Sequence, residues 1–128
     1  MGVVRFKDDV TFDSDGYGNK GSLAPGGVRI LSAVEQAAAS LPFDVTVTSA
    51  RDGKHSGPDD PHPKGNALDV RTHGLTGEQK KQLLDRIMHF LGYRFFGFIE
   101  HPDPDPVPEG YISNEHIHVQ VKKDTVYP

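Results

Sequence analysis

The chain has 128 residues, a net charge of −4 at pH 7 and a pI near 5.9. This length predicts a single domain over residues 1–128, and the acidic balance argues against nucleic acid or an anionic membrane as the main partner. The sequence contains no Cys, which excludes disulfide bonds and thiolate metal sites, and it has no apolar run long enough to span a bilayer. Residues 1–5 lead directly into charged residues, so we expect no secretory signal and synthesis in the cytoplasm. We also expect a monomer.

The first half of the chain predicts two strands and a helix. Residues 3–12 alternate loosely and predict a short strand, followed by a Gly-rich loop over residues 13–18. This loop has the look of a calcium-binding loop, but Ala24 stands where an EF-hand has Glu, so we prefer a solvated turn. Apolar residues at helical spacing predict a helix over residues 25–40, and the β-branched residues 45–49 predict a strand.

The second half of the chain predicts one more helix and three more strands. Strands are expected over residues 67–72, 94–100 and 116–122, the last with the cleanest alternation of apolar and polar side chains. Thr76-Gly-Glu-Gln79 is a capping box and predicts a helix that runs to about Leu91. These elements indicate an α+β fold, in which two helices cover the apolar face of a small, mostly antiparallel sheet and the other face is open and polar.

Candidate metal ligands lie at two places in the chain. His62 and Asp69 are seven residues apart, with Gly65 between them to allow a tight turn, and both residue types bind Zn²⁺ at about 2.0–2.2 Å. Alone, they could equally be a turn histidine and a strand-end aspartate. A catalytic zinc needs three protein ligands, and the His116-x-His118 pair can supply the third. Alternation places this pair and Asp69 on the open face, which favours a metal site.

The order of these motifs also resembles a known group of proteins. The motifs are Arg51 to His55, then His62-x-x-Gly65-x-Ala67-x-Asp69-x-Arg71, a helix, a strand that ends in Glu100, and His116-x-His118. Over residues 45–122 this pattern resembles the zinc peptidase superfamily of D-alanyl-D-alanine carboxypeptidases, vancomycin-resistance-type dipeptidases and phage L-alanyl-D-glutamate endopeptidases. It also resembles the Hedgehog amino-terminal signalling domain, which shares their fold.

The resemblance implies a fold, a cofactor and a substrate class. It implies zinc bound by His62, Asp69 and His118, with His116 beside the ligands, and a bacterial cell-wall peptide as substrate. It leaves open which bond is cleaved, and whether the protein acts in the cytoplasm or on the cell wall after release. Asp60-Pro61 departs from the pattern by replacing the usual Ser before the first histidine.

The loop over residues 101–113 is a second departure, because it is longer than the link expected there. It holds four prolines and is either a functional wall or a surface insertion.

Two carboxylates could act as the general base of such an enzyme. Glu115 forms Glu-x-x-His with His118, as in the dipeptidases, and Glu100 ends an aromatic strand, as in the Hedgehog-like branch. We favour Glu100, because it shares a face with Phe96 and Phe98, an apolar setting that suits a general base. If strand pairing includes Glu115, its side chain points away from the histidines.

Arg51 completes the set of candidate catalytic residues. It could bind a substrate carboxylate or the oxyanion, or it could form a surface ion pair with a neighbouring aspartate. The predicted chemistry is metal-assisted hydrolysis of an amide, in which Glu100 or Glu115 removes a proton from water and Arg51 or His116 stabilises the oxyanion. The alternative is a non-catalytic, Hedgehog-like zinc module that binds a partner.

Overall fold

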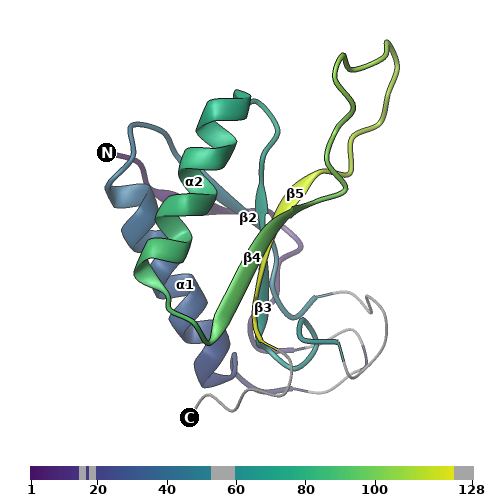
Figure 1. The fold of residues 1–128 in the computed structure, drawn as a ribbon. Helices are drawn as coiled ribbons and strands as arrows, with labels where there is room; N and C mark the ends of the chain where they lie inside the picture. The colour runs from purple at the N-terminus through teal and green to yellow at the C-terminus, as the bar shows by residue number, and fades with distance from the viewer. Residues whose placement is uncertain (15–16, 18–19, 53–59, 123–128) are drawn as a thin grey trace.

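The computed structural model describes residues 1–14, 17, 20–52 and 60–122. In this part of the chain, five strands form one mixed sheet and two helices pack against one of its faces (Figure 1). The elements in chain order are β1 (Val4–Phe6), α1 (Pro25–Ala39), β2 (Val45–Ser49), β3 (Ala67–Arg71), α2 (Gly77–Phe90), β4 (Phe95–Glu100) and β5 (His116–Val121). Half of the Gly-rich loop over residues 13–18, namely residues 15, 16 and 18, lies outside the described residues, as does His55.

The strands run in the order β1-β2-β3-β5-β4. β1 and β2 are parallel, and the other neighbours are antiparallel, which agrees with the expected α+β class and its mostly antiparallel sheet. The strand expected over residues 3–12 is wrong in its length, because it ends at Phe6. The amide of Val10 donates to the carbonyl of Lys7 there, and this turn takes the chain away from β2.

Both helices begin and pack as their sequences predict. Pro25 occupies the first turn of α1, where its missing N–H costs nothing, and the apolar stripe of this helix is fully buried. Thr76 and Gln79 form the predicted capping box at the start of α2. Leu83 and Ile87 of this helix are fully buried, and each contributes roughly 1.5–3 kcal/mol of stability.

Alternation along the strands separates the core from the polar face. Leu68 and Val70 of β3, and Ile117 and Val119 of β5, are buried in the core beneath the helices. Asp69 lies on the opposite face, as the period of two requires. Within the described residues, neither helix has the length and apolar character that a membrane crossing requires.

A tight turn before β3 brings the chain back to the sheet. The amide of Gly65 donates to the carbonyl of His62, and the amide of Asn66 donates to the carbonyl of Pro61. Gly65 has φ +78°, and a Cβ atom there would lie 2.7 Å from the backbone nitrogen of Ala24. Only glycine therefore fits this position without strain or a shift of the segment before α1.

Replacing Gly65 with Ala should lower the free energy of unfolding by roughly 1–3 kcal/mol, because it adds both an unfavourable φ and a backbone clash. Gly74→Ala is the matched control, since Gly74 has φ +84° but open space around its Cβ position. Urea denaturation of metal-free protein measures both changes. Equal losses in the two variants would mean that the clash with Ala24 contributes nothing.

Candidate metal centre

Three buried side chains from distant parts of the chain meet on the open face of the sheet. Asp69 and His118 are direct partners in the register of β3 and β5, and His62 reaches them from the turn before β3. The Oδ1 atom of Asp69 lies 3.1 Å from Nε2 of His62 and 3.0 Å from Nδ1 of His118. The two ring nitrogens are 3.2 Å apart. These three predicted ligands therefore form a triangle of potential metal ligands.

The outer ring nitrogens decide which tautomers the two histidines adopt. Nδ1 of His62 lies 2.8 Å from the carbonyl oxygen of Ala50, which can only accept, so this nitrogen carries a proton. Nε2 of His118 lies 2.7 Å from Oε1 of Gln120 and donates to it in the same way. The nitrogens that face Asp69 therefore present lone pairs in the neutral rings. Gln120 was not predicted as a site residue, although the alternation of β5 placed it on this face.

Asp60 helps to fix the first histidine. Its Oδ1 atom accepts a hydrogen bond of 3.0 Å from the amide of His62. This contact is typical of an Asp that stabilises a turn two residues ahead. The Asp60-Pro61 departure from the family pattern thus keeps a polar group that orients the histidine.

The triangle fits a divalent metal ion in both geometry and charge. In a tetrahedral zinc site with bonds of 2.0–2.1 Å, neighbouring ligand atoms are about 3.3 Å apart, close to the observed separations. Two imidazole nitrogens and one carboxylate oxygen are a ligand set that zinc accepts. Three converging lone pairs also repel one another unless a positive charge lies between them. This cluster can hold a metal ion.

Without a metal, a proton can supply that charge. Burial favours the neutral carboxyl of Asp69, but hydrogen bonds from His118 and His62 outweigh burial and lower the pKa of Asp69. Burial likewise favours the neutral ring of His118, but the hydrogen bonds to Asp69 and Gln120 raise the pKa of His118 above its usual value. The metal-free cluster therefore tends to keep a proton on His118.

A second pair of side chains, His116 and Glu100, lies beside the triangle on the same face of the sheet. His116 of β5 is paired in register with Glu100 of β4, and its Nε2 atom is 2.8 Å from Oε1 of Glu100. Nδ1 of His116 lies 2.9 Å from the carbonyl of Asn114 and must donate to it, so one proton lies between Nε2 and Oε1. Oε1 of Glu100 is also 3.9 Å from Nδ1 of His118. The favoured base is thus close to the ligand triangle.

Asp69, Glu100 and His116 form a second group that could bind a metal ion, with ligand atoms within 4.8 Å of one another. This group shares Asp69 with the first and is less buried. We therefore regard the triangle of His62, Asp69 and His118 as the principal site.

Glu115 immediately precedes β5 and is held by contacts with other elements. Its Oε1 atom is 2.6 Å from Nζ of Lys80 and accepts a hydrogen bond of 2.6 Å from Thr72, and its Oε2 atom accepts from the amide of Asp103. Burial raises the pKa of Glu115, but these contacts, led by the one with Lys80, lower it below the usual value. Strand pairing begins only at His116 and does not include Glu115. The contacts of the Glu115 side chain hold α2 and residues 101–115 together.

Arg51 is buried, so the alternative in which it forms an ion pair on the surface is wrong. Its guanidinium donates to the backbone carbonyls of Pro63, Gly21 and Ser22. These contacts tie the segment before α1 to the turn that carries His62. A role for Arg51 at the oxyanion stays a prediction.

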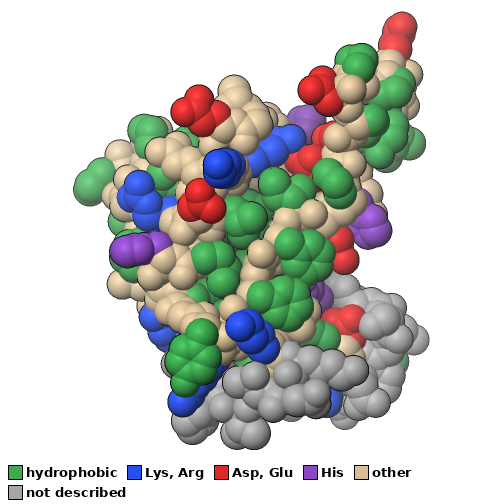
Figure 2. Space-filling model, in the orientation of Figure 1, with side chains coloured by type: hydrophobic (Ala, Val, Ile, Leu, Met, Phe, Trp, Pro, Cys, Tyr) green, Lys and Arg blue, Asp and Glu red, His purple; other side chains and the backbone are tan. Residues whose placement is uncertain are grey.

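A cavity of about 460 Å³ opens over the cluster. Besides the three potential ligands, its walls include Asp60, Glu100, His101, Asn114 and His116. Residues 101–115, which we call the arm, begin and end at this cavity and project beyond the sheet (Figure 1). Hydrophobic side chains are exposed along the arm (Figure 2), among them Val107 and Ile112. The two ends of the arm, at His101 and Asn114, are part of the wall of this cavity.

No protein-family model, curated protein or solved structure matches this chain. The resemblance to the zinc peptidases and to the Hedgehog domain therefore stays a prediction. The geometry of the cluster is independent of it.

Replacing His118 or His62 with Ala should abolish tight zinc binding, because two remaining ligands cannot hold the ion. Elemental analysis should give about one zinc per wild-type chain and much less in either variant. Zinc should also raise the melting temperature of the wild type but of neither ligand variant, since binding is linked to folding. His89→Ala, at an exposed histidine of α2, is the control. Full occupancy in either variant would contradict the assignment, and two ions per wild-type chain would mean that the second group also binds.

The pH should act on the metal-free and zinc-loaded proteins in opposite directions. Without metal, the ion pair of Asp69 and His118 stabilises the fold. Its contribution to the free energy of unfolding is complete at pH values between the ordinary pKa values of Asp and His, about 3.9 and 6.5. This stability is lost as the pH rises through the raised pKa of His118, or falls through the lowered pKa of Asp69. Zinc affinity should instead increase with pH, because protons leave His118. Melting curves between about pH 5 and pH 8, with zinc or with a chelator, test this, and a zinc affinity that does not change over this range would contradict histidine ligation.

Proposed function

We propose that this protein is a zinc-dependent peptidase that hydrolyses an amide bond in peptides of the peptidoglycan type. The observation that carries the proposal is the position of Glu100, whose carboxylate lies at the edge of a buried triangle of three metal ligands, inside one cavity. A hydrolytic zinc site needs three protein ligands, an open position and a carboxylate near that position. Three candidate ligands beside a cavity, with the carboxylate of Glu100 close to them, support this proposal.

Zinc is the metal that suits the ligand set best. His62 and His118 would offer one imidazole nitrogen each and Asp69 one carboxylate oxygen, a combination that occurs in catalytic zinc sites. When bound there, zinc polarises an amide carbonyl and acidifies a water molecule. The chain's own residues must then move the protons.

Glu100 and His116 are arranged to carry out that proton transfer. One proton lies between Oε1 of Glu100 and Nε2 of His116, and the contact of His116 with the carbonyl of Asn114 holds its ring in place. When His116 keeps this proton, Glu100 is a carboxylate whose other oxygen can accept a proton from water. Glu100 can later return a proton to the leaving amine. His116, at the wall of the cavity, can face a developing oxyanion.

The substrate class rests on the motif resemblance, in which the His62-x-x-Gly65-x-Ala67-x-Asp69 segment and the His116-x-His118 pair match those of cell-wall peptidases. This argument is separate from the chemistry of the site. We include both D-Ala-D-Ala and L-Ala-D-Glu bonds among the candidate bonds.

A partner-binding zinc module is the second candidate function. The exposed apolar side chains of Val107 and Ile112 on the arm favour it, because isolated apolar segments of this kind often contact other proteins. Such a protein would bind zinc at the same residues and would cleave nothing.

Replacing Glu100 with Gln should leave zinc binding and folding intact but reduce hydrolysis by at least ~10²-fold, because an amide cannot accept the proton of water. The assay incubates zinc-loaded protein with purified peptidoglycan and with D-Ala-D-Ala, and identifies products by mass spectrometry. Glu115→Gln is the matched control. It should keep turnover and lose stability, because Glu115 holds Lys80 and the amide of Asp103.

Loss of turnover in Glu115→Gln alone would overturn the assignment of the base. Wild-type turnover in both variants would mean that neither carboxylate is the base. A wild-type protein that binds zinc but cleaves neither substrate would support the partner-binding module.

A further inference from the structure

Arg71 occupies a distinctive position on the open face. In β3 it lies two residues beyond Asp69 on the same face, and in the register it is paired with His116 of β5. The open face therefore carries two parallel rows across three strands. The first row is Asp69, His118 and Phe98, and the second row is Arg71, His116 and Glu100. Arg71 and the favoured base thus flank the same histidine.

Among the described residues, Arg71 has no hydrogen-bond or ion-pair partner, whereas every other arginine of the chain has one or another interaction. The interacting arginines are Arg5, Arg29, Arg51, Arg86 and Arg94. The side chain of Arg71 is exposed. An unpaired guanidinium beside a buried acidic and histidine cluster is available to bind an anion.

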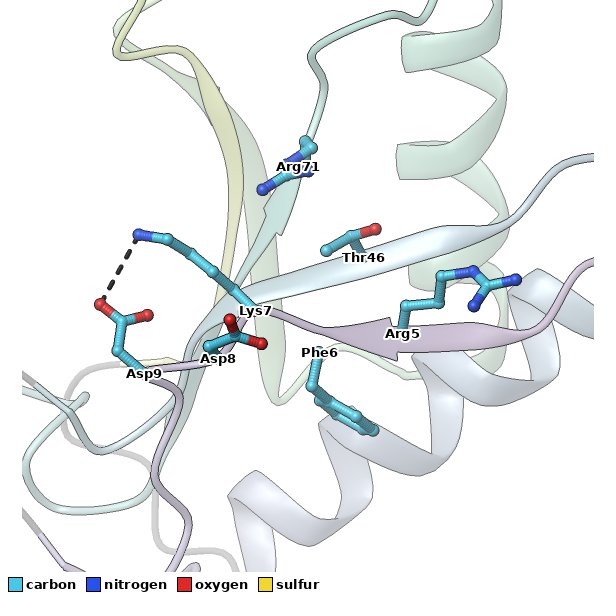
Figure 3. Close-up of a pocket in the computed structure, with 7 residues that line it drawn as sticks. All are labelled: Arg5, Phe6, Lys7, Asp8, Asp9, Thr46 and Arg71. Atoms are coloured by element: carbon cyan, nitrogen blue, oxygen red, sulfur yellow. Dashed lines mark ion pairs between the residues drawn. The ribbon is translucent and has the colours of Figure 1, made fainter.

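Arg71 lines two cavities, one of which reaches the candidate metal centre. One, of about 570 Å³, is lined by Arg71 together with Asp69 and His116. The other, of about 410 Å³, runs from Arg71 across the sheet to Lys7 and Arg5. Figure 3 shows the side chains of Lys7 and Arg71 extending to the same side of the sheet. A ligand that lies at the cluster can therefore reach Arg71 without leaving the surface.

Two of the acidic side chains that line these cavities are already paired with lysines. Asp9 pairs with Lys7 at 3.6 Å, and Glu115 is held by Lys80. Asp8 also lines the second cavity. Lys7 also lines the first cavity but is paired with Asp9, whereas Arg71 lies beside His116 in the register of the sheet.

We propose that Arg71 binds a carboxylate of the substrate and so positions the neighbouring amide over the metal centre. This inference rests on the proposed function. The Cα atoms of Asp69 and Arg71 are roughly 7 Å apart along β3. One residue of a bound peptide spans roughly 3.5 Å, and the long side chain of Arg71 can cover the difference between these two lengths. The ligand class is a peptide with a carboxylate on that residue, supplied either by a free C-terminus or by an acidic side chain.

A binding experiment tests this assignment independently of turnover. Three probes are titrated by NMR into chelator-treated protein, checked for folding by circular dichroism, and into zinc-loaded protein. The probes are D-Ala-D-Ala, its C-terminal amide, and L-Ala-D-Glu with an amidated α-carboxyl group. Wild-type protein should bind at least one acid about tenfold more tightly than the uncharged amide, and this preference should weaken as salt increases.

Arg71→Gln should remove the preference for the acid, because the amide side chain has no positive charge and no bidentate fork. Arg86→Gln, on α2 at the opposite face, is the matched control and should keep it. A preference for D-Ala-D-Ala assigns Arg71 to a terminal carboxylate, and a preference for the glutamate probe assigns it to a side chain. Equal affinity for acid and amide in wild type, or a preference that survives in Arg71→Gln, overturns the proposal.

Failure of this proposal and failure of the proposed function give different results. If the protein cleaves peptides but shows no carboxylate preference, Arg71 is not the anchor. If the preference depends on Arg71 but nothing is cleaved, the cavity lined by Arg71, Asp69 and His116 is a carboxylate-binding site in a protein without peptidase activity.

Discussion

The convergence of His62, Asp69 and His118 on one point is the interaction on which the polar face of this protein depends. The facing atoms lie 3.0–3.2 Å apart and are buried, so their lone pairs repel unless a proton or a cation lies between them. One positive charge therefore holds together a turn and two strands that are distant in the sequence. Whether that charge is a proton or a metal ion determines both the stability of this region and its chemistry.

The same strands that carry the cluster also build the core, and this explains how the site can be well defined. Leu68 and Val70 alternate with Asp69, and Ile117 and Val119 alternate with the histidines of β5. Packing of the helices against the apolar face fixes the positions of these strands, and side chains on rigid strands are held more accurately than those on loops. The third ligand, His62, lies outside a strand. Its position depends on the turn at Gly65 and on hydrogen bonds from its own ring and backbone.

The two candidate glutamates lie in different surroundings. Glu115 satisfies Lys80, Thr72 and an amide of the arm, and contacts of this kind stabilise a fold. Glu100 has a histidine partner and opens onto the cavity. The difference follows from their partners, which are Lys80 and Thr72 for Glu115 and His116 for Glu100. Arg51 also makes structural contacts, as Glu115 does, because its guanidinium binds backbone carbonyls inside the protein.

Local sequence patterns alone determined the helices, most strand limits and the candidate ligands. Alternation over residues 116–121 placed both histidines on one face, and the Thr76–Gln79 capping box marked the start of α2, because these features depend only on near neighbours in the chain. The tertiary structure decided that β5 lies between β3 and β4, which aligns Arg71, His116 and Glu100 in one row. It also decided that Arg51 is buried and that Glu115 meets Lys80. Strand order, register and burial arise from contacts between residues far apart in the sequence, and no local period encodes them.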